Sequence, residues 1–433
     1  MNDNLASSAT AIILHTAIRG RSNTWETHAI SRLEEARGLS EAISLDIAHA
    51  EVITLKKIHP ATLFGSGVVT RLKGMVQSLC ADLVVIDGGV TPVQQRNLEH
   101  HLAAKVIDRT GLILEIFGER ARTKEGQLQV ELAHLLYQRS RLVRSWTHLE
   151  RQRGGFGFLG GPGETQIEID RRLIDIRIAK INKNLDKVKR MRELHRKARK
   201  RVPYPIVALV GYTNAGKSTL FNSLTQAEAL TQDKLFSTLD PTMRAVSLAS
   251  GRRIIISDTV GFISDLPHEL IAAFRATLEE VIDADLIVHV RDIAIPETDI
   301  QCRDVANVLK QMDVPRSADQ PIIEVLNKID LLSAEKLDQH IELSTRNDWK
   351  VPLSALNGSG IQRLLDRIDE IFAIKRATLG VSVPCEDGET LAWLYRRGEV
   401  VERHNGEEKI YLKVLLDSED IARLHKRYSI DLL

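Results

Sequence analysis

Short apolar runs alternate with helix-forming segments along most of this 433-residue chain. Mostly aliphatic runs of three to five residues predict buried strands at residues 11–14, 83–86, 206–210, 254–256, 286–290 and 322–326. Shorter strands are predicted at residues 106–107 and 112–114, and helices at 26–42 and 92–103. Because strands that alternate with helices usually form parallel sheets covered by helices, the pattern predicts α/β domains.

Residues 125–200 follow a different pattern, in which apolar residues recur at steps of four and three. The first series is Leu128, Leu132, Leu135, Leu142, Trp146 and Leu149, and the second is Ile174, Ile178, Ile181, Leu185 and Val188. Such heptad patterns predict two long helices packed antiparallel as a hairpin, with Arg139 interrupting the first apolar seam.

The connection between these helices and the basic charge of the second helix suggest a binding arm. Residues 151–165 hold six glycines together with Phe156, Phe158 and Leu159, and they exceed the usual length of a helix–helix connection. Residues 171–201 contain 14 Lys and Arg against three acidic residues, whereas the net charge of the whole chain is only +1. A charged run often forms only a solvated helix face, but this density favours an arm that binds a polyanion.

The remaining composition is that of an ordinary globular protein. Cys80, Cys302 and Cys385 lie far apart without a C-x-x-C pair, which argues against a zinc ribbon or a disulfide framework. No apolar run approaches 18 residues and no signal-peptide pattern is present, so no membrane span is predicted. We expect a monomeric cytoplasmic protein.

A phosphate-binding loop is the most specific motif in the chain. The pattern G-x-x-x-x-G-K-[ST] follows the apolar run at 206–210 and precedes helix-forming residues that begin with Thr219. It consists of Gly211, Tyr212, Thr213, Asn214, Ala215, Gly216, Lys217 and Ser218. Backbone N–H groups of this loop would hold the phosphates of a nucleotide, Lys217 would reach the β- and γ-phosphates, and the Ser218 hydroxyl would bind Mg²⁺.

Three later segments follow in the order that a GTPase requires, and Asp330 in the second of them selects guanine rather than adenine. They are Asp258, Thr259, Val260 and Gly261, then Asn327, Lys328, Ile329 and Asp330, then Ser354, Ala355 and Leu356. Asp258 would hold the Mg²⁺ shell, and the Gly261 N–H would contact the γ-phosphate. The Asp330 carboxylate can accept N1–H and N2–H of guanine, which adenine cannot offer. The last segment would donate a backbone N–H to the guanine O6.

Other residues bear on catalysis. Phe236, Ser237, Thr238, Leu239 and Asp240 are predicted to form the first switch segment, where either Thr238 or Thr242 could bind Mg²⁺. Phe262 follows the Asp-x-x-Gly motif where many GTPases have a water-orienting glutamine, so we expect slow intrinsic hydrolysis. The Asn214 amide could bind K⁺ beside the phosphates or could only stabilise the turn, and the sequence favours neither.

These motifs divide the chain into four regions. We predict an N-terminal α/β domain at 1–122, a basic helical hairpin at 123–202, a GTP-binding domain at 203–373 and a small C-terminal domain at 374–433. In the last region, residues 410–414 predict a strand and 418–427 a helix. Glycine-containing segments at 65–67 and 87–89 favour ordinary turns over a second ligand site.

The chain resembles the HflX family of ribosome-associated GTPases. The resemblance rests on R-T-G-L-I-L at 109–114, R-A-R-T at 120–123, L-V-R-S-W-T-H-L-E-R-Q at 142–152, G-P-G-E-T-Q at 161–166 and the GTPase motifs above. It implies a doubly wound P-loop GTPase domain in a factor that binds the large (50S) ribosomal subunit. The hairpin tip would reach its rRNA near the peptidyl-transferase centre and help to split or rescue stalled ribosomes. It also implies catalytic roles for Lys217, Thr238 and Gly261, with Thr238 as the Mg²⁺ ligand.

The sequence departs from this family at the tip and leaves alternatives open. Gly160 stands where the family often has an arginine, and the loop is about one residue longer. Arg291 has no interpretation from the sequence. The main alternative is an RNA chaperone in which the nucleotide is mainly structural. A GTPase coupled to tRNA modification and a P-loop ATPase, including ATP use by the N-terminal domain, are further alternatives.

Overall fold

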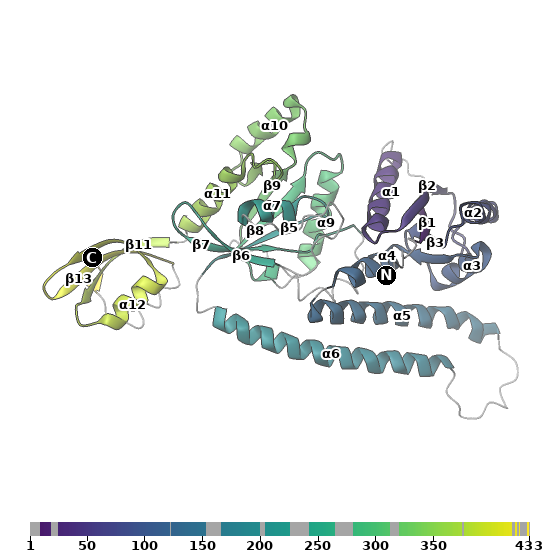
Figure 1. Cartoon of the computed structure of the whole chain (residues 1–433), viewed down its shortest axis with the longest axis horizontal. Helices are drawn as coiled ribbons and strands as arrows, with labels where there is room; N and C mark the ends of the chain where they lie inside the picture. Colours follow the sequence, from purple (N-terminus) through teal and green to yellow (C-terminus); the bar gives the residue numbers. More distant parts are fainter. Residues whose placement is uncertain are drawn as a thin grey trace, which may run out of the picture.

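The computed structural model contains three sheets and one long helical hairpin (Figure 1). The structure describes residues 9–18, 25–121, 123–152, 166–199, 204–225, 242–264, 280–311, 320–374, 376–417, 421, 424 and 431–432. The predicted class, a P-loop α/β domain with an α/β domain and a hairpin before it and a small domain after it, is confirmed. No helix in these ranges is both long and apolar enough to cross a bilayer.

The N-terminal sheet is parallel, with the strand order β2-β1-β3-β4. Its strands are β1 Thr10–Ile18, β2 Asp46–Leu55, β3 Leu83–Asp87 and β4 Lys105–Asp108. Its helices are α1 Trp25–Ala42, α2 Ser66–Leu79, α3 Pro92–Leu102 and α4 Arg109–Arg120. The carboxyl ends of β3 and β4 therefore place Asp87 and Asp108 on neighbouring strands of one sheet edge.

The strand predicted at residues 112–114 is wrong, because these residues lie in α4. Asp108 caps this helix, and its Oδ1 accepts the Gly111 N–H at 2.9 Å. Residues 112–114 are fully buried in a cluster that continues into the next sheet. A helix buried on several faces has a continuous apolar run, which a short strand also has.

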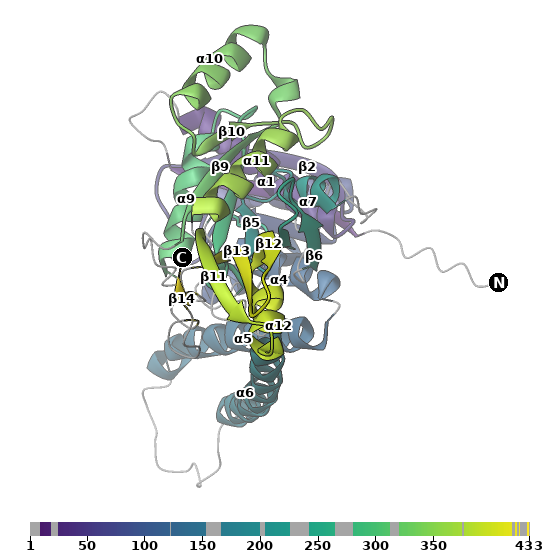
Figure 2. The same ribbon diagram turned by 90° about the vertical axis from the view of Figure 1, so that its left-hand side faces the viewer.

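The hairpin consists of α5 (Lys124–Gln152) and α6 (Gln166–Arg199), which lie side by side along the molecule (Figures 1 and 2). Leu135 packs with Ile178 and Ile181, so the predicted antiparallel apolar seam is confirmed in this part. Arg139, which interrupts the seam, pairs with Asp175 across the two helices at 3.0 Å.

The central sheet has the order β10-β9-β8-β5-β7-β6, in which only β6 runs antiparallel to its neighbour. Its strands are β5 Ile206–Gly211, β6 Thr242–Ser247, β7 Arg253–Asp258, β8 Leu286–Asp292, β9 Ile322–Asn327 and β10 Lys350–Pro352. Its helices are α7 Lys217–Thr225, α9 Thr298–Gln311, η1 Ile329–Leu331, α10 Ala334–Thr345 and α11 Ile361–Ile374. The phosphate-binding loop, the Asp-x-x-Gly segment and the two base-recognition segments therefore lie at the carboxyl ends of β5, β7, β9 and β10.

The C-terminal sheet is antiparallel, with the order β12-β13-β11-β14, and it lies at the opposite end of the molecule from the N-terminal domain (Figure 1). Its elements are β11 Arg376–Pro384, α12 Gly388–Arg397, β12 Glu399–Asn405, β13 Lys409–Asp417 and β14 Asp431–Leu432. The strand predicted at 410–414 is confirmed within β13. Most of the helix predicted at 418–427 lies outside the described residues.

Candidate nucleotide-binding site

The loop between β5 and α7 forms the centre of the site, and two of its positions accept only glycine. A Cβ on Gly211 would lie 2.2 Å from the Val290 carbonyl oxygen. Gly216 has a φ of 91°, and a Cβ there would lie 2.2 Å from Asn327 Nδ2. The loop is therefore pressed against β8 and β9 in a way that any side chain would prevent.

Lys217 is buried at the start of α7, where its Nζ donates to the Tyr212 carbonyl at 2.7 Å. Burial lowers the pKa of Lys217 to about 8, although the charge of Asp258 acts to raise it. Next to it, Ser218 Oγ donates to Asp258 Oδ2 at 2.8 Å. A buried ammonium group favours a nearby anion, since an opposite charge stabilises its protonated form.

The remaining loop residues suit a phosphate chain. Thr213 is buried, and its Oγ1 has no hydrogen-bond partner among the described residues. The N-terminus of α7 adds backbone N–H groups that favour anions. Asn214 is exposed, with a φ of 58°, a conformation that asparagine adopts more readily than most residues. This backbone explains why asparagine suits the turn, and it leaves the amide accessible.

The Asp-x-x-Gly segment lies directly beside the loop. Asp258 ends β7 and pairs with Leu209 of β5, and Thr259 Oγ1 donates to the Leu209 carbonyl at 2.6 Å. A Cβ on Gly261 would lie 3.0 Å from Lys217 Nζ and 2.9 Å from Thr213 Cγ2. The fold thus places Gly261 against Lys217, although 44 positions separate them in the sequence.

Phe262 belongs to the core and not to the phosphate side of the site. Its N–H donates to the Gly211 carbonyl at 3.0 Å, and its carbonyl accepts the Thr213 N–H at 2.7 Å. Its side chain is 1% exposed and packs with Val260 and Ile263. The side chain therefore does not take the place of a water-orienting glutamine, and slow intrinsic hydrolysis stays a prediction.

Asn327 joins the phosphate loop to the last motif. Its Nδ2 donates to the Ala215 carbonyl at 2.8 Å, and its Oδ1 accepts the Ala355 N–H at 3.0 Å. Ser354 is fully buried beside it. The buried amide of Asn327 thus fixes three loops, which come from β5, β9 and β10, at one edge of the sheet.

The base-recognition residues lie at the open end of this arrangement. Lys328 has a φ of 66°, and its Nζ lies 2.8 Å from Asp292 Oδ2. The following turn of η1 leaves Asp330 exposed, and Leu356 is 82% exposed. A carboxylate at an accessible edge next to buried backbone donors is suited to the edge of a planar base.

Two groups of predicted residues lie outside the described residues. The first switch segment, Phe236 to Asp240 with Thr238, is one of them. The other is the hairpin tip at 153–165, and the side chains of Arg151 and Gln152 are not described either. The roles predicted for both segments stay predictions.

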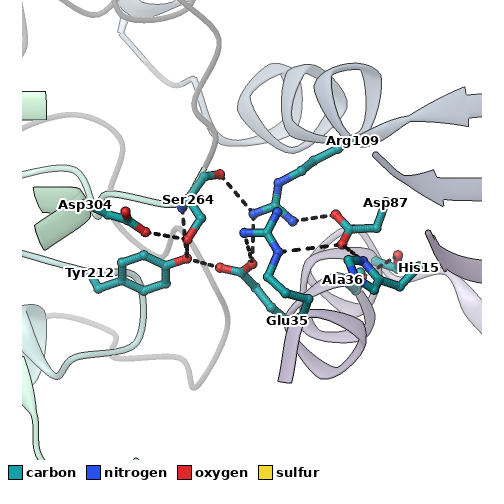
Figure 3. A network of polar contacts seen from close by, with 10 residues as sticks. His15, Glu35, Ala36, Asp87, Arg109, Tyr212, Ser264 and Asp304 are labelled. Atoms are coloured by element: carbon teal, nitrogen blue, oxygen red, sulfur yellow. Dashed lines mark hydrogen bonds and ion pairs between the residues drawn. The ribbon is translucent and has the colours of Figure 1, made fainter. Parts of the chain in front are cut away.

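The structure gives a role to Arg291, for which the sequence offered no interpretation. It also shows polar contacts near the site that the sequence did not predict. Arg291 binds Glu324 at 3.0 Å and Asp299 at 2.6 Å, so it links β8, β9 and α9 as an ion-pair partner. Glu35, Arg109 and Ser264 form a polar network with Tyr212 of the phosphate loop (Figure 3). Arg109 lies in the R-T-G-L-I-L motif, but no sequence signal connects it to residue 264.

The chain matches four protein-family descriptions in succession. They are GTP-binding GTPase N-terminal at residues 30–118, GTP-binding GTPase Middle Region at 120–199, 50S ribosome-binding GTPase at 206–328 and HflX C-terminal domain at 340–430. Together they span most of the chain in the order in which the four regions occur.

Individual proteins are similar over nearly the same length. GTPase HflX of Magnetococcus marinus is 50% identical over 394 residues, which cover 90% of this chain and 89% of that protein. GTPase HflX of Escherichia coli is 41% identical over 399 residues, covering 91% and 92%. A crystal structure of SsGBP with GDP has a TM-score of 0.48 and 24% identity, over 84% of this chain and 98% of that one. The sequence relatives and the family matches show that this chain is a GTPase and belongs to the HflX family.

Proposed function

We propose that this GTPase binds the large ribosomal subunit in its GTP form and splits or rescues stalled ribosomes, acting as a monomer in the cytoplasm. The observation that carries the proposal is the match of residues 206–328 to a family described as 50S ribosome-binding GTPase, next to a strongly basic helix. The GTP state would control how the hairpin docks onto rRNA.

The geometry supports a specific division of roles at the nucleotide. Lys217 and the loop N–H groups hold the β- and γ-phosphates, and the Gly261 N–H meets the γ-phosphate beside Lys217. Ser218 and the predicted ligand Thr238 would hold Mg²⁺, which would neutralise negative charge on the phosphates. Asp330 binds the N1 and N2 hydrogens of guanine, and the backbone at 354–356 binds O6.

The charge of α6 supports contact with rRNA. Its described basic residues lie mostly on exposed positions, while Ile178 and Ile181 face α5. The exposed basic residues are Arg171, Arg172, Arg177, Lys180, Lys183, Lys187 and Arg190. Lys and Arg on one surface of a helix bind phosphates without reading sequence, so the docking should weaken by about 0.7–0.9 log units per log[salt] for each phosphate neutralised.

Cosedimentation with purified 50S subunits tests the proposal directly. We expect more binding with a non-hydrolysable GTP analogue than with GDP, and stimulation of GTP hydrolysis by 50S subunits. Deletion of residues 154–163 should remove most of the stimulation while the intrinsic rate stays the same. Equal binding in both nucleotide states would refute the switch, and stimulation that survives the deletion would refute the role of the tip.

Two further variants separate the alternatives. Lys217→Ala should abolish nucleotide-dependent 50S binding, whereas an RNA chaperone with a structural nucleotide would keep its RNA remodelling.

Comparison of hydrolysis in Na⁺ and K⁺ tests the proposed cation role of Asn214. A faster rate in K⁺ that is lost in Asn214→Ala supports it, and equal rates leave only the turn role.

A further inference from the structure

Asp292, the last residue of β8, lies beside the segment that is predicted to recognise guanine. In the sheet register it is the partner of Asn327, which ends β9 and begins that segment. The Asp292 side chain is 9% exposed, and both of its carboxylate oxygens are engaged. Oδ1 accepts the Ala294 N–H at 3.0 Å, and Oδ2 lies 2.8 Å from Lys328 Nζ. The fold therefore holds a buried carboxylate against the ammonium group of Lys328.

The backbone of Lys328 has an unusual conformation at this point. Its φ of 66° lies in the left-handed region, which is unfavourable for a residue with a side chain. The Lys328 carbonyl accepts the Leu331 N–H at 3.1 Å, and the Asn327 carbonyl before it accepts the Ile293 N–H at 3.2 Å. These bonds turn the chain from β9 into η1, which carries Asp330. The conformation of Lys328 therefore determines where Asp330 is presented.

The charged residues around Asp292 leave it free to pair with Lys328. In the part of the chain that the structure describes, Asp292 is the only ion-pair partner of Lys328. The neighbouring cation, Arg291, does not compete for this carboxylate, because it pairs with Glu324 at 3.0 Å and with Asp299 at 2.6 Å. Two successive residues of β8 thus have separate partners. Arg291 binds β9 and α9, whereas Asp292 binds the turn that follows β9.

The ion pair fixes the lysine side chain at the base-recognition edge. A lysine has four methylene groups between its backbone and its ammonium group, and this stem packs against apolar surface while the charge keeps a polar partner. Because Asp292 holds Nζ and the turn holds the backbone, the stem of Lys328 is held at both ends. The side chain is 24% exposed, so part of it stays accessible two residues before Asp330. A fixed apolar stem next to a carboxylate suits the flat face of a base whose edge that carboxylate binds.

We propose that Asp292 is a positioning residue for guanine-nucleotide binding. It holds the ammonium group of Lys328, so that the stem of this lysine forms one wall for the base, and it supports the turn that presents Asp330. The inference rests on the proposed contact of Asp330 with the N1 and N2 hydrogens of guanine. The base is the same in GTP and GDP and takes no part in cleavage of the γ-phosphate. Loss of the ion pair therefore weakens binding of both nucleotides by the same factor and leaves the hydrolysis step unchanged.

Asp292→Asn tests the proposal, because it removes the charge but keeps the size of the side chain and the acceptor for the Ala294 N–H. We expect the dissociation constants of fluorescent GDP and of a non-hydrolysable fluorescent GTP analogue each to rise about tenfold, as for loss of a hydrogen bond between charged groups. KM for GTP should rise with them, while kcat without ribosomes stays within about twofold. Adding Asp292→Asn to Lys328→Met should have little further effect, because both changes remove the same ion pair.

The matched control is Asp299→Asn, which makes the same chemical change on α9. Asp299 pairs with Arg291 and its side chain is 86% exposed, so both dissociation constants should stay as in wild type. If Asp292→Asn does not fold, Lys328→Met removes the same ion pair from the partly exposed side and should raise both constants equally. Unchanged nucleotide affinity in the variant that folds, additive losses in the double variant, or a fall in kcat alone would overturn the proposal.

A variant of Asp330 tests the placement of the base separately. The amide of Asp330→Asn can donate to the C2 oxygen of xanthine, so this variant should lose GDP affinity and gain affinity for XDP. Without that exchange, the placement of guanine at Asp330 is wrong and the role of Asp292 falls with it. With the exchange and no effect of Asp292→Asn, guanine lies at Asp330 as proposed, and only the positioning role of Asp292 is wrong.

Discussion

Asp108, the last residue of β4, and Arg109, the first residue of α4, connect the N-terminal domain to two different parts of the molecule. Arg109 enters the GTP junction, defined by Glu35, Arg109, Tyr212 and Ser264. Asp108 enters the hairpin junction, in which Tyr137 Oη donates to its Oδ1 at 2.7 Å and Arg141 pairs with its Oδ2. One sheet edge therefore contacts both the nucleotide site and the helical hairpin.

The two junctions differ in how far they are closed to water. The Arg109 side chain is 5% exposed, whereas that of Arg141 is 18% exposed and stacks on the Tyr137 ring at 4.3 Å. A cavity of about 550 Å³, lined by residues of α3, α5 and α6, adjoins the hairpin junction. Because Arg141 is more accessible to water than Arg109, its contacts should cost less to break than those of Arg109. The GTP junction is suited to keep its residues in one fixed arrangement. The hairpin junction is better suited to a hairpin whose angle can change.

The largest expected effect is that of Arg109→Ala on stability. This variant leaves Asp87 and Glu35 buried without their main cation, which costs about 3–5 kcal/mol for a buried pair. Arg141→Ala, in the more open junction, should cost less than half as much. Urea denaturation of both variants measures the difference, and equal losses would remove the distinction between the junctions.

A pH dependence of stability should follow from Asp87. Burial acts to raise its pKa, but the hydrogen bond from His15 and the charges of Arg109 and Arg32 lower it from 3.8 to about 2. A carboxyl group with a lowered folded pKa stabilises the fold above its unfolded pKa and loses this effect as pH falls through the folded value. The contribution is about 2 kcal/mol at neutral pH and disappears between about pH 4 and pH 2.

Asp87→Asn tests this pH dependence. The variant should be less stable at pH 7 and should show a flatter decline of the unfolding free energy between pH 4 and pH 2. Thermal melts across this range provide the measurement. If wild type and variant lose stability in parallel below pH 4, other carboxyl groups account for the decline.

Tyr137→Phe should separate the two junctions functionally. Loss of one hydrogen bond to Asp108, which keeps Arg141 and the Gly111 N–H, costs about 1 kcal/mol. Intrinsic GTP hydrolysis should be unchanged, because Tyr137 has no part in the GTP junction. Stimulation by 50S subunits should fall a few-fold if the hairpin must be held at a set angle. An altered intrinsic rate would mean that the junctions are not independent.

The sequence predicted the parts of the site that depend on short segments. Gly216, Lys217 and Gly261 lie within a few residues of the ends of β5 and β7, and Asn327 ends β9, so local spacing indicates both their geometry and their chemistry. The GTP junction could not be predicted, because Glu35, Arg109 and Ser264 are 74 and 155 positions apart and charged residues usually face solvent. The apolar run at 112–114 led to a wrong strand prediction. A helix that is buried on several faces has no alternation of apolar and polar residues that would reveal its period.

The smallest expected effect on the free energy of unfolding is that of replacing Arg139. This exposed ion pair serves as a comparison for the more buried pairs of both junctions. Arg139 and Asp175 join α5 and α6 at 3.0 Å, but their side chains are 43% and 47% exposed. Exposed pairs contribute little, because water screens the attraction and both side chains lose rotational freedom, so Arg139→Gln should change stability by less than about 0.5 kcal/mol. The same urea denaturation measures it. A loss as large as that of Arg141→Ala would mean that charge on α5, and not closure of the junction, determines these energies.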